Sequence, residues 1–499
     1  MLWLLVAVPA IAALLSFALP WNGLRRVLLV LSASVHVGLT VAVFVEPPEP
    51  VLDGWIALDA ASLLFLAITS VLFFVTSLYT VGYLAQEKRP ATLDPTEAVR
   101  FANYPEAVFT GCLLMFLAAM TLVLVSHHWG LMWVAVEATT LASAPLIYFH
   151  RHPRSLEATW KYLLICSVGI ALALLGNFFL AVSAKACPGE SLHLTIAGLE
   201  QHASQLNRDW LRAAFLLLLV GYGTKMGLAP MHTWLPDAHS EAPSMVSALL
   251  SGVLLNCAFL AVLRGHSLLV KAGEGQFSRD LLVLFGLLSM AFAAAFVIRQ
   301  ADYKRLLAYS SVEHMGILVL GVGIGGIAAF GSLLHAVNHS LTKAMLFLAA
   351  GNTLHRCHTK STAEIRGLFR VLPVTAVLWI VGLLAITGSP PFGTFLSELV
   401  ILKGMIDGGR IVVAVAYLLA LAVVLIGMSA IVIAMVYGKP AAAESSAESN
   451  PEASDTSPEP AWSILPPLFL GLAVLFLGLC VPRELSDLLH EAARVLGAE

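Results

Sequence analysis

The stretch KMGLAPMHTWLPDAH, residues 225–239, interrupts an apolar segment with two prolines and a glycine. Proline removes a backbone donor and clashes with the preceding turn, so a helix must kink or unwind here. A second stretch, TGSPPFG at residues 387–393, has the same character. Unwound backbone is tolerated inside a bilayer only where protein or a water-filled cavity covers it. Pro230, Pro390 and Pro391 therefore predict two discontinuous helices, helices 7 and 12 along the chain.

The rest of the chain has the composition of a polytopic membrane protein. Its 499 residues are 59% hydrophobic and only 12% charged, with a mean hydropathy of +0.86. A crossing helix needs about 20 apolar residues, and the polar breaks divide the chain into about fourteen such segments. The sequence predicts an all-α fold of about fourteen transmembrane helices, in which residues 2–20 form a retained first helix rather than a cleaved signal.

The two interruptions also divide the chain into regions. Paired broken helices in corresponding parts of two halves are typical of transporters built from inverted repeats, with the ion path at the breaks. Prolines are common in membrane helices, however, so the breaks alone do not decide the matter. We expect N-terminal helices 1–3 in residues 1–106, a five-helix repeat in 107–265, its inverted copy in 266–438, a disordered acidic linker in 439–460, and helix 14 with an amphipathic tail in 461–499.

Lysine and arginine are unevenly distributed between alternate loops. The side that carries Arg25, Arg26, Arg299 and Arg366 is richer in them than the side to which we assign Arg264. By the positive-inside rule the richer side is cytoplasmic. Both termini are therefore expected outside, in a multi-pass protein of the cell inner (plasma) membrane.

No residue pattern predicts a cofactor, a metal site or a nucleic-acid partner. The six cysteines show no C-x-x-C pair or ligand spacing, which argues against iron–sulfur clusters, zinc and disulfides. The chain has no G-x-G-x-x-G or P-loop motif. Its net charge of −3 gives no sign of binding to nucleic acid.

Glu137 and Lys225 are ionisable residues inside apolar segments. Such residues are costly at membrane depth and usually mark functional sites. Burial disfavours a charged carboxylate, whereas a neighbouring ammonium favours it, so a pair of this kind can control the binding of a proton. A purely structural ion pair is the alternative for these two residues.

His335, His339 and Lys343 follow one another at i, i+4 spacing and form one stripe of a helix. An imidazole can accept a proton on one nitrogen and donate from the other, so the stripe could conduct protons. The alternatives are hydrogen bonds between helices and haem ligation. Haem is disfavoured because no matching buried histidine pair stands out elsewhere in the sequence.

Other polar residues near the breaks receive weaker assignments. Glu398 follows the second break and could end the path, and His314 lies within reach of the core. We expect Lys304 to be a cytoplasmic anchor and His127 to be solvated at a loop edge. His239, near the first break, is expected to belong to a cytoplasmic cap rather than to a metal site.

Three motifs carry a family resemblance. KMGLAPMHTWLPDAHSEAP at residues 225–243, ADYKRLLAYSSVEHMG at 301–316 and HAVNHSLTKAMLF at 335–347 resemble the antiporter-like subunits of respiratory complex I, membrane-bound hydrogenases and Mrp antiporters. Residues 133–176 are most similar to the hydrogenase-4 component F type. The resemblance covers helices 4–13.

This resemblance implies specific roles. It implies fourteen helices with two inverted repeats, Glu137 and Lys225 as the input pair, a central relay of His335, His339 and Lys343, and Glu398 at the exit. Asn256 stands where many relatives carry a lysine, so the link to the relay would depend on water or His314.

The sequence therefore predicts a non-redox, proton-translocating subunit of a complex I-related oxidoreductase, without a redox site or cofactor of its own. Its expected partners are other membrane subunits and, through them, a peripheral redox module. An Mrp-type Na⁺/H⁺ antiporter subunit is the main alternative.

Overall fold

Helices form most of the described chain. The structure, a computed structural model, describes residues 1–87, 92–93, 100–101, 103–185, 194–439 and 458–497. The helices of the first half are α1 (Leu2–Ala18), α2 (Asn22–Val45), α3 (Ala60–Gln86), α4 (Glu106–Val125), α5 (Trp129–Ile147), α6 (Pro153–Ala184), α7 (Ile196–Gln201) and α8 (Arg208–Met226). Two-residue strands, β1 (Thr92–Leu93) and β2 (Arg100–Phe101), form an antiparallel pair.

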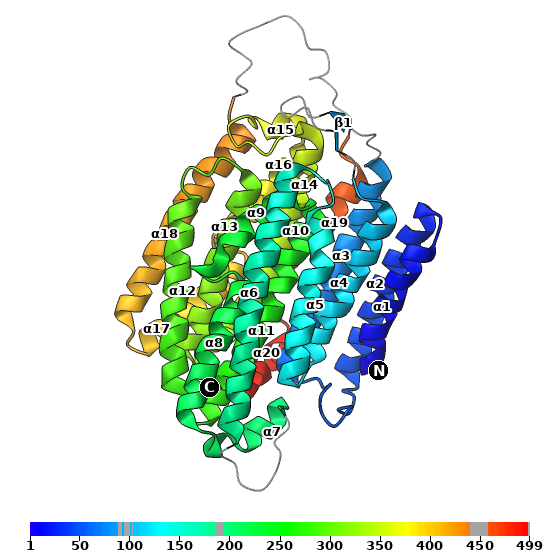
Figure 1. Cartoon of the computed structure of the whole chain (residues 1–499). Helices are drawn as coiled ribbons and strands as arrows, with labels where there is room; N and C mark the ends of the chain where they lie inside the picture. The colour runs from blue at the N-terminus through cyan, green and yellow to red at the C-terminus, as the bar shows by residue number, and fades with distance from the viewer. Residues whose placement is uncertain (88–91, 94–99, 102, 186–193, 440–457, 498–499) are drawn as a thin grey trace, which may run out of the picture.

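The remaining helices complete an elongated bundle. They are α9 (Trp234–Glu241), α10 (Ser244–Leu249), α11 (Leu255–Lys271), α12 (Gly275–Val297), α13 (Tyr303–Ile324), α14 (Ile327–Cys357), α15 (Leu368–Val371), α16 (Pro373–Ile386), α17 (Gly393–Asp407), α18 (Ile411–Tyr437), α19 (Ala461–Leu479) and α20 (Arg483–Val495). In Figure 1 the long helices run side by side, and both chain ends lie toward the lower end of the bundle.

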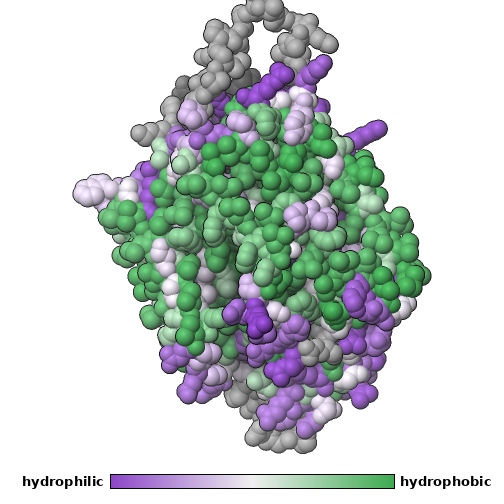
Figure 2. Space-filling model, turned by 180° about the vertical axis from the view of Figure 1, so that it is seen from behind, coloured by the Kyte–Doolittle hydropathy of each residue, from purple (hydrophilic) through white to green (hydrophobic). Residues whose placement is uncertain are grey.

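The surface is that of a membrane protein. Eleven helices among the described residues are long and apolar enough to cross a bilayer. Figure 2 shows a broad apolar band between two hydrophilic ends. The long helix α14 is not among the eleven, because its polar stripe lowers its hydropathy. The predicted all-α membrane class is confirmed.

The first predicted break separates α8 from α9. Gly227 ends α8 with a φ of +84°, in the left-handed region that glycine adopts without steric cost. The groups freed by the break find partners, because Trp234 Nε1 donates to Thr224 O at 2.8 Å and Ala229 N donates to Ser289 Oγ at 3.0 Å. Protein therefore covers the unwound backbone, as burial in a membrane requires.

The second predicted break separates α16 from α17. Gly388 adopts a φ of +63°, and Pro390 and Pro391 follow it before α17 begins at Gly393. The Thr394 hydroxyl donates to the carbonyl of Ala385, which also accepts from Gly388 N at 3.3 Å. Both interruptions lie where the proline-rich stretches predict them. Residues 227–229 and 392–393 are buried, whereas Pro230, Pro390 and Pro391 are exposed.

Helix α14, which carries the predicted stripe, and the helices around it form the centre of the bundle. Residues 244–271 are buried along nearly their whole length and contain a π-helical stretch, Leu250–Leu254, between α10 and α11. Such π-bulges are frequent at functional sites. Helices α13 and α14 pack against each other and are buried over most of their length.

The C-terminal part of the described chain contains a short helix, α20, after α19. Helix α20 buries Leu489, Ala492 and Ala493 and packs against α3 and α14. Most of the predicted linker, residues 440–457, lies outside the described residues.

Candidate functional site

Lys225 and Glu137 meet through the hydroxyl of Thr140. Lys225, in the last turn of α8, is fully buried, and its Nζ donates to Thr140 Oγ1 at 2.8 Å. Thr140 Oγ1 donates to Glu137 Oε2 at 3.2 Å. The two residues predicted as a pair therefore lie in one hydrogen-bond chain, with threonine between the ammonium and the carboxylate.

Tyr162 of α6 is the second partner of Lys225. Its hydroxyl accepts from Lys225 Nζ at 2.6 Å and lies 2.6 Å from Ser143 Oγ. Lys225 Nζ is also 4.5 Å from the centre of the tyrosine ring, a cation–π distance. Neither Thr140 nor Tyr162 was predicted from the sequence. The i+3 spacing of Thr140 after Glu137 was the available signal for the first.

Asn256 connects the helix after the first break to the stripe on α14. Its Nδ2 donates to Ser340 Oγ at 2.7 Å and to Gly252 O at 3.0 Å. Ser340 follows His339 in the sequence of α14. Asn256, where the resemblance leads us to expect lysine, thus makes a neutral contact toward the relay.

Lys343 faces α13. Its fully buried Nζ donates to Leu307 O at 2.7 Å and to Ser310 Oγ at 2.8 Å. Glu313, one turn further along α13, is also buried. The ammonium therefore has neutral oxygen partners, and a carboxylate lies on the same helix that supplies them.

His314 and His335 are in direct contact. His314 Nδ1 and His335 Nε2 are 2.8 Å apart, and His335 Nδ1 lies 2.9 Å from Ser397 Oγ on α17. The ring of His339 is 5.1 Å from that of His314, measured between centroids. Two of the predicted stripe residues and His314 thus form one imidazole cluster at the α13–α14 contact.

Glu398 lies beside this cluster rather than at a distance from it. One ligand atom each of His314, His335 and Glu398 lie within 4.8 Å of one another. The carboxylate packs against the turn of the second break, since a Cβ added at Gly388 would lie 1.9 Å from Glu398 Oε2. The Glu398 carboxylate therefore lies directly against the backbone of the second break.

The cluster fits a hydrogen-bond chain better than a metal site. Two imidazole nitrogens on a tetrahedral zinc ion lie about 3.3 Å apart, whereas those of His314 and His335 are 2.8 Å apart. The second nitrogen of His335 already pairs with Ser397. Axial haem ligands must face each other across the porphyrin, which stacked and hydrogen-bonded rings cannot do.

Several polar atoms of the cluster have no hydrogen-bond partner among the described residues. Buried polar atoms are normally satisfied by protein or by ordered water. Unpaired atoms on neighbouring buried residues therefore indicate a place for bound water. These atoms are His314 Nε2, both ring nitrogens of His339, both amide atoms of Asn338, Asn256 Oδ1 and Glu398 Oε1.

One prediction about the region around the first break requires correction. Lys304 is not an exposed anchor, because it is fully buried and donates to Ala242 O at 2.5 Å. His239 is also fully buried, stacked on Phe347 of α14. The surface around them does carry charges, since Asp237 pairs with Lys161 at 2.9 Å and Arg305 at 3.0 Å.

An ion pair that the sequence did not predict, between buried Arg264 and half-buried Asp59, lies near the other end of the bundle. Arg264 belongs to α11 rather than to a loop, is 2% exposed, and binds both carboxylate oxygens of Asp59, the N-cap of α3. His127, expected to be solvated, is buried and lies 3.6 Å from the same carboxylate. Burial raises the pKa of Asp59, but Arg264 and His127 outweigh burial and hold that pKa well below its ordinary value.

Comparison with known proteins defines the family. Residues 126–425 match the family described as NADH:quinone oxidoreductase/Mrp antiporter, TM, and the chain belongs to this family. A relative named hydrogenase-4 component F homolog, from Methylacidiphilum infernorum (isolate V4), is 39% identical over 360 residues, which cover 72% of this chain and 73% of the relative. The resemblance found in the sequence motifs is confirmed.

Solved structures share the fold over the whole chain. A chain of the membrane-bound sulfane sulfur reductase, an archaeal respiratory membrane complex, matches with a TM-score of 0.84 and 21% identity, covering 99% of this chain and 97% of that one. A chain of the Mrp complex from Dietzia sp. DQ12-45-1b matches with a TM-score of 0.81 and 21% identity, covering 100% and 96%.

Proposed function

We propose that this chain is a proton-translocating, non-redox membrane subunit of a complex I-related oxidoreductase of the hydrogenase-4 type. The observation that carries the proposal is the series of buried polar side chains that runs from α5 to α17. It contains the buried ionisable residues Lys225, Lys343, His314, His335, His339 and Glu398, and it begins at Glu137, which is half-buried. Intramembrane residues of this kind typically mark ion paths.

Proton transfer along the series would use the contacts described above. A change of charge at Glu137 reaches Lys225 through the Thr140 hydroxyl, which can accept and donate. From there Asn256 and Ser340 lead toward Lys343, and bound water would complete the steps that no direct contact covers. His314, His335 and Glu398 would then pass the proton across the second break.

The energy that this mechanism requires is modest. Moving one elementary charge against 100 mV takes about 2.3 kcal/mol. One pKa unit corresponds to about 1.4 kcal/mol, so coupled changes in proton affinity of one or two units at successive sites would suffice. Electron transfer in partner subunits would supply the first charge change, near Glu137 and Lys225.

The proposal includes a topology. Adding α1, α14 and the α16–α17 pair to the eleven apolar helices gives fourteen crossings, with two inverted repeats each containing one broken helix. The basic end that carries Arg299 and Arg366 would face the cytoplasm of a plasma membrane, with both termini outside.

Membrane subunits of the same complex and a peripheral redox module are the proposed partners. The names of the relative and of the structural neighbours support this assignment, since they describe a hydrogenase component and a respiratory membrane complex. The decisive experiment purifies the chain in mild detergent with its native partners, reconstitutes the assembly in vesicles, and measures proton uptake driven by an electron donor.

Variants make this experiment specific. Glu137→Gln and Lys225→Ala should each abolish proton uptake while the complex still assembles and its redox module still turns over. Unchanged proton uptake in either variant would remove that residue from the mechanism, and unchanged uptake in both would reject the proposed input pair.

An Mrp-type Na⁺/H⁺ antiporter subunit is the second candidate, favoured by the match to the Mrp complex over the full length of this chain. It would use the same buried residues. It would, however, exchange Na⁺ for H⁺ in vesicles without any electron donor, and the redox-linked subunit would not.

A further inference from the structure

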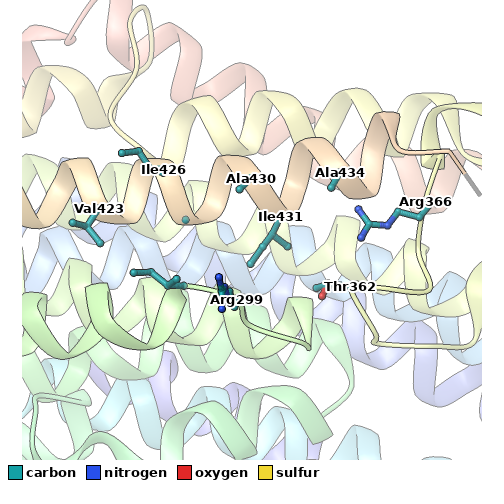
Figure 3. A pocket seen from close by; sticks show the side chains of 10 residues that line it. Arg299, Thr362, Arg366, Val423, Ile426, Ala430, Ile431 and Ala434 are labelled. Atoms are coloured by element: carbon teal, nitrogen blue, oxygen red, sulfur yellow. The ribbon is translucent and has the colours of Figure 1, made fainter.

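A groove outside the proton series lies between α18 and the basic end of the bundle. It has a volume of about 430 Å³ and is lined by Ile298 and Arg299 after α12, Thr362 and Arg366 after α14, and an apolar face of α18. That face consists of Val423, Ile426, Gly427, Ala430, Ile431 and Ala434. Figure 3 shows Arg299, Thr362 and Arg366 along one side of α18, the helix that carries the labelled apolar residues.

Backbone contacts fix the two arginine-bearing loops to each other. Thr362 N donates to Ala301 O at 2.8 Å, and the Thr362 hydroxyl donates to Gln300 O at 3.1 Å. An antiparallel bridge joins Asp302 to Ser361 beside these bonds. Arg299 and Arg366 therefore project from a single clamped unit, although 67 residues of sequence numbering separate them.

Both guanidinium groups are available for a ligand. Arg299 is exposed and Arg366 half-buried, and neither forms an ion pair with any residue that the structure describes. A guanidinium presents a planar fork of donors that fits phosphate oxygens. Two guanidinium groups at the same end of the groove indicate a ligand with an anionic group that has several oxygens.

The apolar part of the groove continues along a helix that faces lipid. Ile426 is 69% exposed, and Ala430 leaves open space beside it. At the floor of the groove, Gly427 lies against α12, since an added Cβ would be 3.0 Å from Val297 Cγ1. The groove thus combines a basic mouth with an apolar wall that follows α18 from Val423 to Ala434.

We propose that this groove binds an anionic glycerophospholipid. The phosphate would lie between Arg299 and Arg366, and an acyl chain would follow α18 past Ala430. A basic pocket between transmembrane helices at the cytoplasmic side is a recognised site for anionic lipid head groups. In the proposed topology, the two arginines lie at the level of the anionic head groups of the cytoplasmic leaflet. We therefore favour a lipid over a protein partner as the occupant of the groove.

The test uses the full chain, together with the partners that copurify with it, in nanodiscs of mixed phosphatidylglycerol and phosphatidylcholine. Native mass spectrometry then counts the lipids retained after the disc is removed. We expect one phosphatidylglycerol to be retained preferentially, and Arg299→Gln/Arg366→Gln to lower its retention at least ten-fold without changing that of phosphatidylcholine. Ala430→Phe should lower retention by filling the groove.

Two matched control variants distinguish an effect at this groove from a general effect of losing a positive charge or of enlarging a side chain on α18. Arg370→Gln removes an exposed arginine of the neighbouring helix α15, which does not line the groove, and Ile433→Phe enlarges an exposed residue of α18 outside it. Both should retain the lipid as the parent chain does. Inorganic phosphate should not compete, because it lacks the acyl chain.

Any of three results would overturn the proposal. The first is equal retention of phosphatidylglycerol in the parent and in the double arginine variant. The second is an equal loss in Arg370→Gln. The third is a partner helix cross-linked to position 430 in the purified complex, which would show that protein occupies the groove.

Discussion

Glu137 and Lys225 share a single threonine hydroxyl. Thr140 Oγ1 accepts from Lys225 Nζ at 2.8 Å and donates to Glu137 Oε2 at 3.2 Å. A hydroxyl in this position transmits a charge change between the two residues only while it accepts a hydrogen bond from the lysine and donates one to the glutamate. The chemistry of the proposed input pair therefore depends on a residue that is not itself ionisable.

Thr140→Val tests this relation, because valine keeps the shape of threonine and removes the hydroxyl. Losing one hydrogen bond to a charged group costs about 1.5–3 kcal/mol, so we expect proton uptake to fall at least ten-fold. Thr140→Ser restores the hydroxyl and should retain uptake close to that of the parent. Equal activity of the valine and serine variants would show that the bridge has no role.

Gly388 provides a steric test of Glu398. Alanine at this position would place Cβ 1.9 Å from Glu398 Oε2, at a φ of +63°. We expect Gly388→Ala to displace the carboxylate from His314 and His335 and to lower proton uptake. The measurement is donor-driven uptake together with the redox rate.

Gly409→Ala is the matched control for Gly388→Ala. Gly409 also follows a helix end, has a φ of +66° and makes the same pattern of backbone hydrogen bonds, but an added Cβ meets nothing within 4 Å. Its variant carries a similar backbone cost without touching the cluster, so uptake should remain near the parent level. If both glycine variants lose uptake equally, backbone strain rather than the position of Glu398 is responsible.

The sequence predicted the class, the breaks and the buried stripe, because these depend on local patterns. Hydropathy defines the helices, prolines define the interruptions, and i, i+4 spacing places His335, His339 and Lys343 on one face. Contacts between distant segments were not accessible in this way. The meeting of His314 with His335, and of Glu398 with both, depends on how α13, α14 and α17 pack.

The errors have a common origin. Arg264, Lys304 and His127 each lie near the end of an apolar run, where a charged or imidazole side chain is normally solvated. The structure buries all three, because distant residues supply their partners: Asp59 for Arg264 and His127, and Ala242 O for Lys304. Partners so far apart in the chain leave no local signal in the sequence.

Asp59→Asn should destabilise the fold by about 3–5 kcal/mol, the usual cost of leaving a buried charge without its partner. The uncompensated charge is that of Arg264, which is 2% exposed. Thermal unfolding in detergent at pH 7 measures the loss. Asp59→Asn/Arg264→Met removes both charges and should recover part of it, and no recovery would show that the ion pair is not the cause.

The same pair predicts a pH dependence. Because the pKa of Asp59 is lower in the folded chain than its ordinary value, its stabilisation is fully present above the unfolded pKa of about 3.9. It is lost as the pH falls through the folded-state pKa. In a His127→Gln background, which removes the second partner of Asp59 from the comparison, the difference in Tm between the chain with Asp59 and its Asp59→Asn variant should therefore stay constant from pH 8 to pH 5. A difference that already narrows within this range would contradict the assignment.

Asn256 and Ser340 test whether the input pair and the relay are connected at this point. Asn256→Leu and Ser340→Ala each remove one end of the 2.7 Å contact between α11 and α14. If the contact conducts, each single variant interrupts the same step and lowers uptake, and the double variant lowers it no further. Independent roles would instead give losses that multiply, which a double-mutant cycle on the uptake rate distinguishes.

Asn256→Lys completes the series, because it introduces the charge that the family resemblance leads us to expect at this position. An active lysine variant with a changed pH profile would show that the step tolerates a titrating group, whereas three variants with unchanged uptake would exclude Asn256 from the path.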